Sequence, residues 1–401
     1  MATIAVLGTF DTKGAEHAYV ADLIRKRGHH PLLVDVGGFG EPQIQADVSP
    51  PMVAREAGFD WAALKAQKDR GEMVAAFAKG AEQVVGRLAR EGQIQGVISL
   101  GGGGGTAIAT TAMRALPVGF PKVMVTTLAS GNTAPYVGSK DIVLFPSIVD
   151  VAGLNRVSRV ILARAAGAIC GMVETSPPPA SDRPVIVASM FGNTTDCVQA
   201  GRKILEDAGY EVLVFHATGT GGRTMESLIE SGLAAGVFDV TTTEWADELV
   251  GGILTAGPTR CEAAAKAGVP AVLAPGCLDM VNFGPPETVP ARFQGRRFYR
   301  HNPQVTLMRT TPEECAELGR ILAEKANLSR GPVAVLLPLR GISVISAAGG
   351  SFHDARADEA LFDAIRRHLR PHVERVEVDA AINDPVFAER AAQVLLRYLR
   401  S

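Results

Sequence analysis

Five consecutive glycines follow an apolar run in the first half of the sequence. The segment GVISLGGGGGTAIATTAMRAL (96–116) predicts a buried strand over 96–100, then the glycines, and then a helix from about Thr106. Glycine lets backbone N–H groups approach an anion without a Cβ in the way, and the N-terminus of the next helix is partially positive. A flexible turn or tight helix–strand packing is the alternative explanation. We expect a phosphate site formed by Gly101, Gly102, Gly103, Gly104, Gly105 and Thr106.

The glycine run differs from two well-known phosphate-binding signatures. It does not end in Lys-Ser or Lys-Thr, so a Walker A loop and the mechanism of a P-loop ATPase are not predicted. The acidic residue that contacts ribose in the dinucleotide fingerprint is not at the expected distance either. The expected ligand is therefore a nucleotide bound in another way.

A second polar segment, GTFDTKG (8–14), follows the first predicted strand. Lys13 could neutralise phosphate charge, Asp11 could hold Mg²⁺, and the hydroxyl of Thr12 could donate a hydrogen bond. The alternative is that Asp11 or Thr12 only caps the following helix. We expect all three residues to contact the nucleotide or its metal ion.

A third segment, TLASGNTAPYVGS (127–139), follows a strand over 123–125. Ser130, Gly131 and Asn132 could contact a ribose, a base or a phosphate. The same residues are also typical of an ordinary turn with Asn in a left-handed conformation. Both interpretations remain open.

Three polar segments of the second half follow apolar runs: PGCLDMVNFG (275–284), RRFYRHNPQVTLMRTT (296–311) and PLRGISVISAAGGSFHDARAD (338–358). We expect them to form loops at the carboxyl edge of a second sheet. Cys277 with His301 or His353 could act as nucleophile and base. Asp279 with both histidines could instead hold a divalent metal. Each of these side chains is alternatively a buried structural residue.

An internal repeat predicts the elements that position these segments. Residues 4–40 and 185–221 align without a gap at an offset of 181 residues (185 minus 4). Each reads as a strand, a polar loop, an amphipathic helix and a second strand, and Gly28 and Gly209 fall where a helix C-cap glycine belongs. The sequence therefore predicts an α/β fold of two similar open, mainly parallel-sheet (Rossmann-like) domains. Internal duplication would explain their likeness, and chance similarity between two such units is the alternative.

The segment VETSPPPASDRP (173–184) marks the boundary between the two halves, because three prolines among polar residues are typical of a stiff linker. We expect a nucleotide-binding domain over 1–172, a linker over 173–183, and a second domain with a ligand or catalytic site over 184–401.

The composition limits the expected partners and the expected location of the protein. A net charge of −2 gives no overall positive field, so nucleic acid is not an expected partner. We expect no membrane span, since apolar runs of about 20 residues are missing, and the N-terminal residues do not resemble a secretory signal. Five scattered cysteines without CxxC spacing favour reduced thiols and a cytoplasmic location.

The motifs GTFDTKG, SLGGGGGTA, ASGN, FGNTTD, PGCLDMVNFG, YRHNP and GGSFHD in combination resemble one family over essentially the full chain. This is the family of bacterial and fungal proteins related to the N-terminal domain of the tomato mosaic virus resistance protein. The resemblance implies a two-subdomain α/β fold, ATP binding with Mg²⁺, and a homodimer. It assigns the ATP to residues 11–13, 101–106 and 130–132. The antiviral role of the plant relative depends on a particular surface and is not transferred.

Three functional hypotheses follow. The first is a Mg-ATP-binding enzyme with nucleotide on the first domain and a small-molecule substrate in the cleft between the domains, next to Cys277, His301 and His353. The second is a nucleotide-sensing or scaffold protein without turnover. The third is a metal-dependent lyase or hydrolase centred on the second domain.

Overall fold

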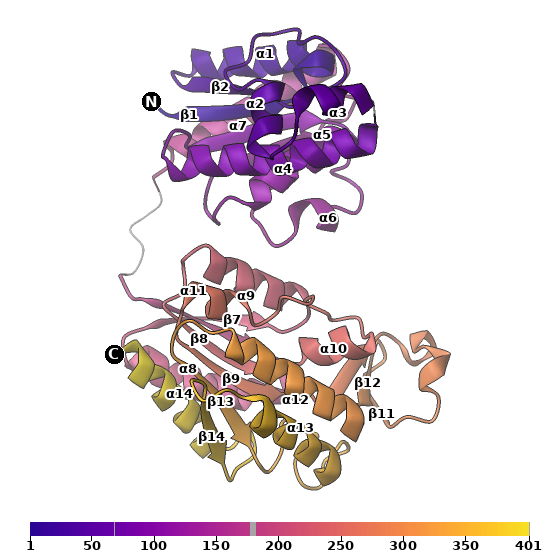
Figure 1. Cartoon of the computed structure of the whole chain (residues 1–401), viewed down its shortest axis with the longest axis vertical. Coiled ribbons are helices and arrows are strands. Elements are labelled where there is room, and N and C mark those ends of the chain that lie inside the picture. Colours follow the sequence, from indigo (N-terminus) through magenta and orange to yellow (C-terminus); the bar gives the residue numbers. More distant parts are fainter. Residues whose placement is uncertain (68, 177–181, 401) are drawn as a thin grey trace. The chain divides into compact units, whose positions relative to one another are not determined.

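The structure is a computed structural model that describes residues 1–67, 69–176 and 182–400. The chain divides into two compact units, Met1–Ala180 and Ser181–Ser401 (Figure 1). The last helix of the first unit ends at Glu174, so the first two residues of the expected linker 173–183 are helical. Residues 177–181 of that linker lie outside the described residues.

Unit 1 alternates strands and helices. Its elements are β1 (Thr3–Gly8), α1 (Phe10–Lys26), β2 (His30–Asp35), α2 (Pro50–Glu56), α3 (Trp61–Gln67), α4 (Arg70–Arg90), β3 (Gly96–Gly101), α5 (Gly103–Arg114), β4 (Lys122–Thr126), α6 (Ala134–Val137), β5 (Val143–Pro146) and α7 (Arg156–Glu174).

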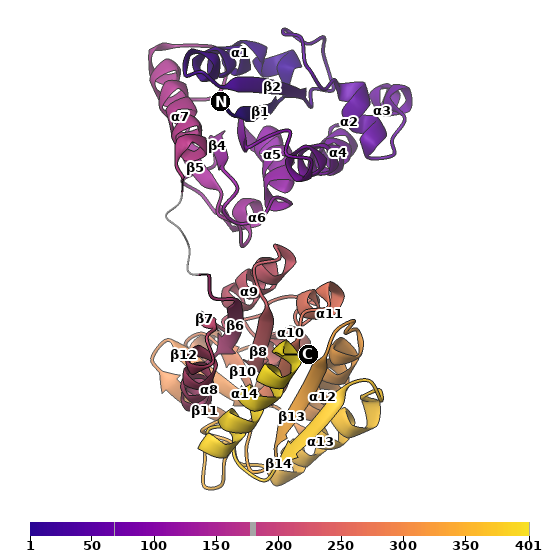
Figure 2. The same cartoon turned by 90° about the vertical axis from the view of Figure 1, so that its left-hand side faces the viewer.

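The five strands of unit 1 form one parallel sheet in the order β2-β1-β3-β4-β5. Helices α1 and α7 pack against one face, and α4 and α5 pack against the other (Figure 2). The strands are apolar runs because both faces are covered. This strand order places a switch point between β1 and β3, where the connections turn to opposite sides and ligands usually bind.

Local signals set the helix ends. Gly28 and Gly209 have φ values of 82° and 97°, and a Cβ at either position would meet nothing within 4 Å. Backbone conformation alone therefore requires glycine there, as the sequence predicted. Asn155 and Ser158 form a capping box at the start of α7, and Asp69 accepts the amide of Glu72 at the start of α4.

Unit 2 continues the alternation and adds an insertion. Its elements are β6 (Val185–Met190), η1 (Gly192–Thr194), α8 (Thr195–Asp207), β7 (Glu211–His216), α9 (Thr220–Glu230), β8 (Gly236–Thr241), α10 (Glu244–Val250), α11 (Ala263–Ala267), β9 (Ala271–Gly276), β10 (Met280–Phe283), η2 (Pro286–Thr288), η3 (Ala291–Phe293), β11 (Phe298–Asn302), β12 (Val305–Arg309), α12 (Pro312–Asn327), β13 (Val333–Pro338), α13 (Ala355–His368), β14 (Glu374–Val378) and α14 (Pro385–Leu399).

The main sheet of unit 2 is also parallel, in the order β14-β13-β9-β8-β6-β7. Its members β7-β6-β8-β9-β13 repeat the order of the five strands of unit 1. Helices α8 and α14 pack on one face, and α9, α12 and α13 pack on the other. The prediction of two similar parallel-sheet domains is confirmed, and the shared strand order agrees with a duplication.

Two of the three polar segments expected to be loops in unit 2 are partly strands. Strands β10, β12 and β11 form an antiparallel sheet between β9 and β13 in the chain. These strands are only four or five residues long, and β11 carries mostly exposed polar side chains. β11 and β12 pair as a hairpin, and β10 joins β12 from about 25 residues earlier in the chain. The polar side chains of β11 hid the strand pattern, because polar residues are uncommon in strands.

None of the helices in the described ranges is long and apolar enough to cross a membrane. All five cysteines are buried and free, so the prediction of unpaired thiols is confirmed.

Candidate functional site

A pocket of about 440 Å³ opens in unit 1 at the carboxyl ends of β1 and β3, which is the switch point of the sheet. It is formed by the segments after β1, β2, β3 and β5 together with one face of α4. Its lining residues are Thr9, Asp11, Thr12, Lys13, Val36, Gly38, Phe39, Arg70, Met73, Val74, Phe77, Gly102, Gly103, Gly104, Gly105, Ile108 and Asp150.

The glycine run is not a loop before a helix that starts at Thr106, as the sequence suggested. Gly101 ends β3, Gly102 is the N-cap, and α5 begins at Gly103. The first hydrogen bond of the helix joins the amide of Thr106 to the carbonyl of Gly102 (2.9 Å). The N–H groups of residues 103–105 precede that bond and have no acceptor within the helix. They are therefore suited to an anion in the pocket.

The fold itself does not require glycine at most of these positions. No residue from 101 to 105 has a positive φ. A Cβ at Gly103 would meet nothing within 4 Å, and at Gly102, Gly104 or Gly105 it would make only ordinary contacts of 3.8 Å or more. Only at Gly101 would it be tight, 3.2 Å from the Cα of Gly105. The free space beside residues 102–105 belongs to the pocket.

A buried histidine stabilises the turn after β1 by a hydrogen bond to its backbone. Lys13 interrupts α1 with non-helical angles (φ −134°, ψ 28°), and its carbonyl lies 2.7 Å from His17 Nδ1. Burial lowers the pKa of His17 to about 4, so its ring is neutral and Nδ1 donates to that carbonyl. The ammonium group of Lys13 donates to the carbonyl of Val151. Lys13 thus adds positive charge to the pocket from a fixed position.

Asp11 lines the pocket, but its carboxylate is largely committed to the protein. Oδ2 accepts the amides of Phe39 (2.9 Å) and Gly40 (3.1 Å). Oδ1 is buried without a hydrogen-bond partner, and it would lie 2.6 Å from a Cβ at Gly37. Asp11 therefore fixes the loop after β2, which differs from the open metal ligand that the sequence suggested.

Helix α4 contributes residues to the pocket, and the sequence analysis did not predict them. Arg70 lies close to the glycine turn, since a Cβ at Gly104 would be 3.9 Å from its guanidinium. Met73, Val74 and Phe77 make the same face of the helix apolar. Their spacing of three and four residues was the available signal. Asp150 was also missed, although it follows β5 at the same edge of the sheet.

The remaining predicted nucleotide contacts do not line this pocket. The hydroxyl of Thr106 is buried and lies 2.7 Å from that of Thr126. Ser130, Gly131 and Asn132 are exposed, and the side chain of Asn132 accepts the amide of Ala134 (3.3 Å). The segment 130–132 is thus an exposed turn, but Asn132 does not have the left-handed conformation considered above.

The structure does not bring the predicted nucleophile and bases of unit 2 together. Cys277 is completely buried in an apolar cluster with Met280 and Phe352. Burial raises the pKa of its thiol well above the usual value, and Asp279 adds to this. His301 is exposed on β11, and His353 is exposed with Nδ1 3.1 Å from the carbonyl of Ser346. Among the described residues, neither histidine makes a hydrogen bond to Cys277.

Asp279 is held inside unit 2 as well. Its Oδ2 accepts the hydroxyl of Ser343 (2.8 Å), and burial raises the pKa of its carboxyl group to about 6. The two histidines do not join it in any group close enough to share a metal ion within the described ranges. The metal hypothesis based on Asp279, His301 and His353 therefore has no supporting geometry in the described structure.

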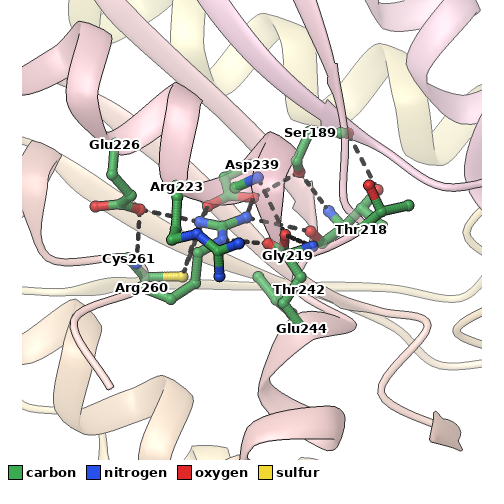
Figure 3. A network of polar contacts seen from close by, with 12 residues as sticks. Ser189, Thr218, Gly219, Arg223, Glu226, Asp239, Thr242, Glu244, Arg260 and Cys261 are labelled. Atoms are coloured by element: carbon green, nitrogen blue, oxygen red, sulfur yellow. Dashed lines mark hydrogen bonds and ion pairs between the residues drawn. The ribbon is translucent and has the colours of Figure 1, made fainter. Parts of the chain in front are cut away.

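Glu226, Asp239 and Cys261 do lie close enough to share a metal ion. However, Figure 3 shows the guanidinium group of Arg260 among them. Arg260 donates to Asp239 Oδ1 (2.7 Å), and to Glu226 (3.1 Å). A cationic side chain thus already occupies this buried group of acids.

Glu244 completes the network around Arg260 and closes the nearby helix end. Its Oε2 accepts from Arg260 Nε (2.6 Å), and its Oε1 accepts the amides of Gly219 (2.7 Å) and Gly222 (3.0 Å). A carboxylate of the chain itself therefore sits at the N-terminus of α9, where an anionic ligand could otherwise bind.

Two doubly wound parallel sheets, the first with an anion-compatible pocket at its switch point, define a two-domain Rossmann-like α/β protein. The models of the uncharacterised protein family (UPF0261) match almost the whole chain, with the N-terminal domain over residues 2–178 and the C-terminal domain over 183–399. The chain belongs to this family.

Sequence relatives agree with this assignment. A UPF0261 protein of Clostridium tetani is 49% identical over 398 residues, which cover 99% of this chain and 98% of the relative. The ToMV resistance protein Tm-1(GCR237) of Solanum lycopersicum is 43% identical over 328 residues, which cover 80% of this chain and 43% of the plant protein. The resemblance inferred from the motifs is therefore confirmed.

Solved structures add only a loose likeness. The UDP-N-acetylglucosamine 2-epimerase of Rickettsia bellii aligns over 100% of this chain and 97% of its own, with 12% identity and a TM-score of 0.23. A likeness at this level has no bearing on function.

Proposed function

We propose that unit 1 binds a Mg-nucleoside triphosphate, with ATP as the first candidate. The phosphates contact the amides at the start of α5, next to Lys13 and Arg70. The base lies against the apolar side of the pocket, formed by Phe39, Met73 and neighbouring residues. The choice of ATP and Mg²⁺ rests on the family resemblance described above.

One observation carries the proposal: glycines occupy helix positions where the fold has room for side chains. Glycine in a helix is less favourable than alanine by about 1 kcal/mol. At Gly103 neither the φ value nor a steric contact accounts for its presence. Close approach of a ligand to the backbone accounts for it, since a Cβ would fill space that the ligand needs.

The test is Gly103→Ala in the full chain. We expect unchanged stability or a gain of up to about 1 kcal/mol, because the helix favours alanine. We expect ATP affinity, measured by calorimetry with Mg²⁺, to fall at least about tenfold, or ~1.4 kcal/mol.

The matched control is Gly171→Ala in α7, where a Cβ would also meet nothing within 4 Å. This variant should keep the wild-type affinity. Equal ATP affinity in Gly103→Ala and the wild type would contradict the proposed phosphate position, and no binding of millimolar ATP to the wild type would contradict the function.

A second candidate is a nucleotide sensor or scaffold without turnover. The burial of Cys277 favours it, because a thiol with a raised pKa inside an apolar cluster is a poor nucleophile. Release of phosphate from ATP by the wild type, lost in Gly103→Ala, would favour the enzyme instead. The homodimer implied by the resemblance belongs to both candidates, and light scattering of the purified protein tests it.

A further inference from the structure

A strained turn after β5 carries an acidic residue into the pocket. Ile148 has a φ of 65°, a conformation that β-branched residues rarely adopt, and the residue is 72% exposed. The flanking residues close a tight turn, with the amide of Val149 donating to the carbonyl of Ser147 (2.7 Å) and the hydroxyl of Ser147 donating to the carbonyl of Val149 (2.7 Å). Burial of Ile148 does not explain the strain. Asp150 follows two residues later and lines the pocket.

The segment after this turn is fixed to α1. Lys13 donates to the carbonyl of Val151, and Glu16 Oε1 accepts the amide of Gly153 (2.5 Å). These two contacts hold the strained turn in place, so Asp150 is a built part of the pocket wall.

The carboxylate of Asp150 has an oxygen available to a ligand. Oδ1 accepts the amide of Val151 (2.8 Å), and the described residues donate no hydrogen bond to Oδ2. Asp150 lines the same pocket as Gly102–Gly105 and Lys13. A bare carboxylate beside bound phosphates is repulsive unless a cation lies between them.

The other pocket carboxylate is less available. Both amides that Asp11 Oδ2 accepts belong to the loop after β2, and Oδ1 faces Gly37. Lys13 and Arg70 line the same pocket, but their charges offset those of a triphosphate and the pocket carboxylates only in part. Mg²⁺ prefers phosphate oxygens together with one or two carboxylates.

We propose that Asp150 is the protein ligand of the Mg²⁺ ion that accompanies the nucleotide, and that Asp11 is a structural clamp for the loop after β2. This assignment rests on the proposed nucleotide function. Asp150 would hold the ion, and the bound ion would offset the negative charge of the phosphates.

The test measures ATP binding by calorimetry with and without Mg²⁺, in the full chain, for the wild type, Asp150→Asn, Asp11→Asn and the control Asp22→Asn. Asp22 lies on the exposed side of α1. In the wild type and the control we expect Mg²⁺ to increase ATP affinity at least tenfold. In Asp150→Asn we expect Mg²⁺ to give less than a twofold gain, while affinity without Mg²⁺ equals or exceeds that of the wild type because the repulsion is removed.

The variant Asp11→Asn distinguishes the role of Asp11 from that of Asp150. We expect it to lower the melting temperature and to keep the Mg²⁺ gain, and electron paramagnetic resonance of Mn²⁺ added with ATP should show the same pattern of ion binding. A full Mg²⁺ gain in Asp150→Asn, or its loss in Asp11→Asn alone, would overturn the assignment and leave the nucleotide function standing. Failure of the wild type to bind ATP under either condition would overturn both.

Discussion

Glycine has opposite physical roles in the two units. At Gly222 a Cβ would lie 2.1 Å from Glu244 Oε2, and Gly219 has a φ of 82°, so the fold itself excludes other residues there. At Gly103 neither reason applies. Gly219 and Gly222 allow the backbone to approach the carboxylate of Glu244, whereas Gly103 leaves space beside free amides. Glycine content alone therefore does not mark a ligand site, and neither does a glycine without a structural reason, since Gly171 is one too. Gly103 differs because it also lines a pocket.

At the residue scale, buried His17 predicts how the stability of the protein depends on pH. Its pKa is lowered from 6.5 to about 4 by burial, so the unfolded chain binds a proton that the folded chain excludes. The stabilisation is complete above pH 6.5 and is lost as the pH falls towards 4, by about 3 kcal/mol at 1.36 kcal/mol per pH unit. Urea unfolding at several pH values should show this slope in the wild type, and His17→Gln should lack it. Parallel curves for the two proteins would contradict the prediction.

At the scale of elements, the two units share a strand order but carry different residues at the carboxyl edge of the sheet. In unit 1 the helix after β3 starts with bare glycine amides facing a pocket. In unit 2 the helix after β8 starts with Glu244, which reaches the N-terminus of α9 and binds Arg260. The network is buried because Arg260 and Asp239 are each about 1% exposed. Unit 2 therefore uses this edge for internal ion pairs.

Removal of Arg260 tests this view of the network. Arg260→Leu leaves buried carboxylates without their cation, which should lower the free energy of unfolding by about 3–5 kcal/mol. Burial already raises the pKa of Glu226, and Arg260 opposes that rise, so the variant raises it further. A protein that contains a carboxyl group with a raised pKa becomes less stable as the pH increases. The loss of stability in Arg260→Leu should therefore be larger at pH 8 than at pH 5.5.

Urea unfolding of Arg260→Leu at both pH values checks this prediction. Arg202→Leu on the exposed side of α8 is the control and should change stability by less than about 0.5 kcal/mol. A loss in Arg260→Leu that is equal at pH 5.5 and pH 8 would argue against uncompensated carboxylates as its cause.

At the scale of the whole molecule, the two domains share a strand order but differ at the edge of the sheet where ligands usually bind. The candidate ligand pocket belongs to unit 1, and the corresponding edge of unit 2 is filled by its own side chains. The antiparallel insertion of β10, β11 and β12 exists in unit 2 and has no counterpart in the strand order of unit 1. We therefore expect the nucleotide to act on the first unit.

Hydrogen exchange of the full chain measures where the nucleotide acts. ATP with Mg²⁺ should slow exchange of amides in 9–13, 36–40 and 102–108, because the ligand covers or orders these segments. Exchange in 216–222 and 239–244 should stay unchanged, since Glu244 already occupies the helix end there. Protection confined to the segments of unit 2 would refute the placement.

The sequence by itself determined much of the parallel-strand pattern and the likeness of the two halves, but not the antiparallel strands β10, β11 and β12. Apolar runs bounded by glycine and polar residues specify parallel strands locally, and a positive φ specifies Gly28 and Gly209. The rule that ligands bind at strand ends also led from the sequence to residues 11–13 and 102–105, all of which line one pocket.

Only the tertiary structure decided what each polar side chain does. Asp11 is engaged by a loop that arrives from 28 residues further along the chain, and Cys277 is buried by residues of several distant segments. Arg70 and Asp150 reach the pocket from a helix and a turn that carry no motif of their own. Burial and hydrogen bonding depend on such long-range contacts, which residue types and spacing do not encode locally. The free amides of the glycine run became a candidate site only when the fold left space beside them.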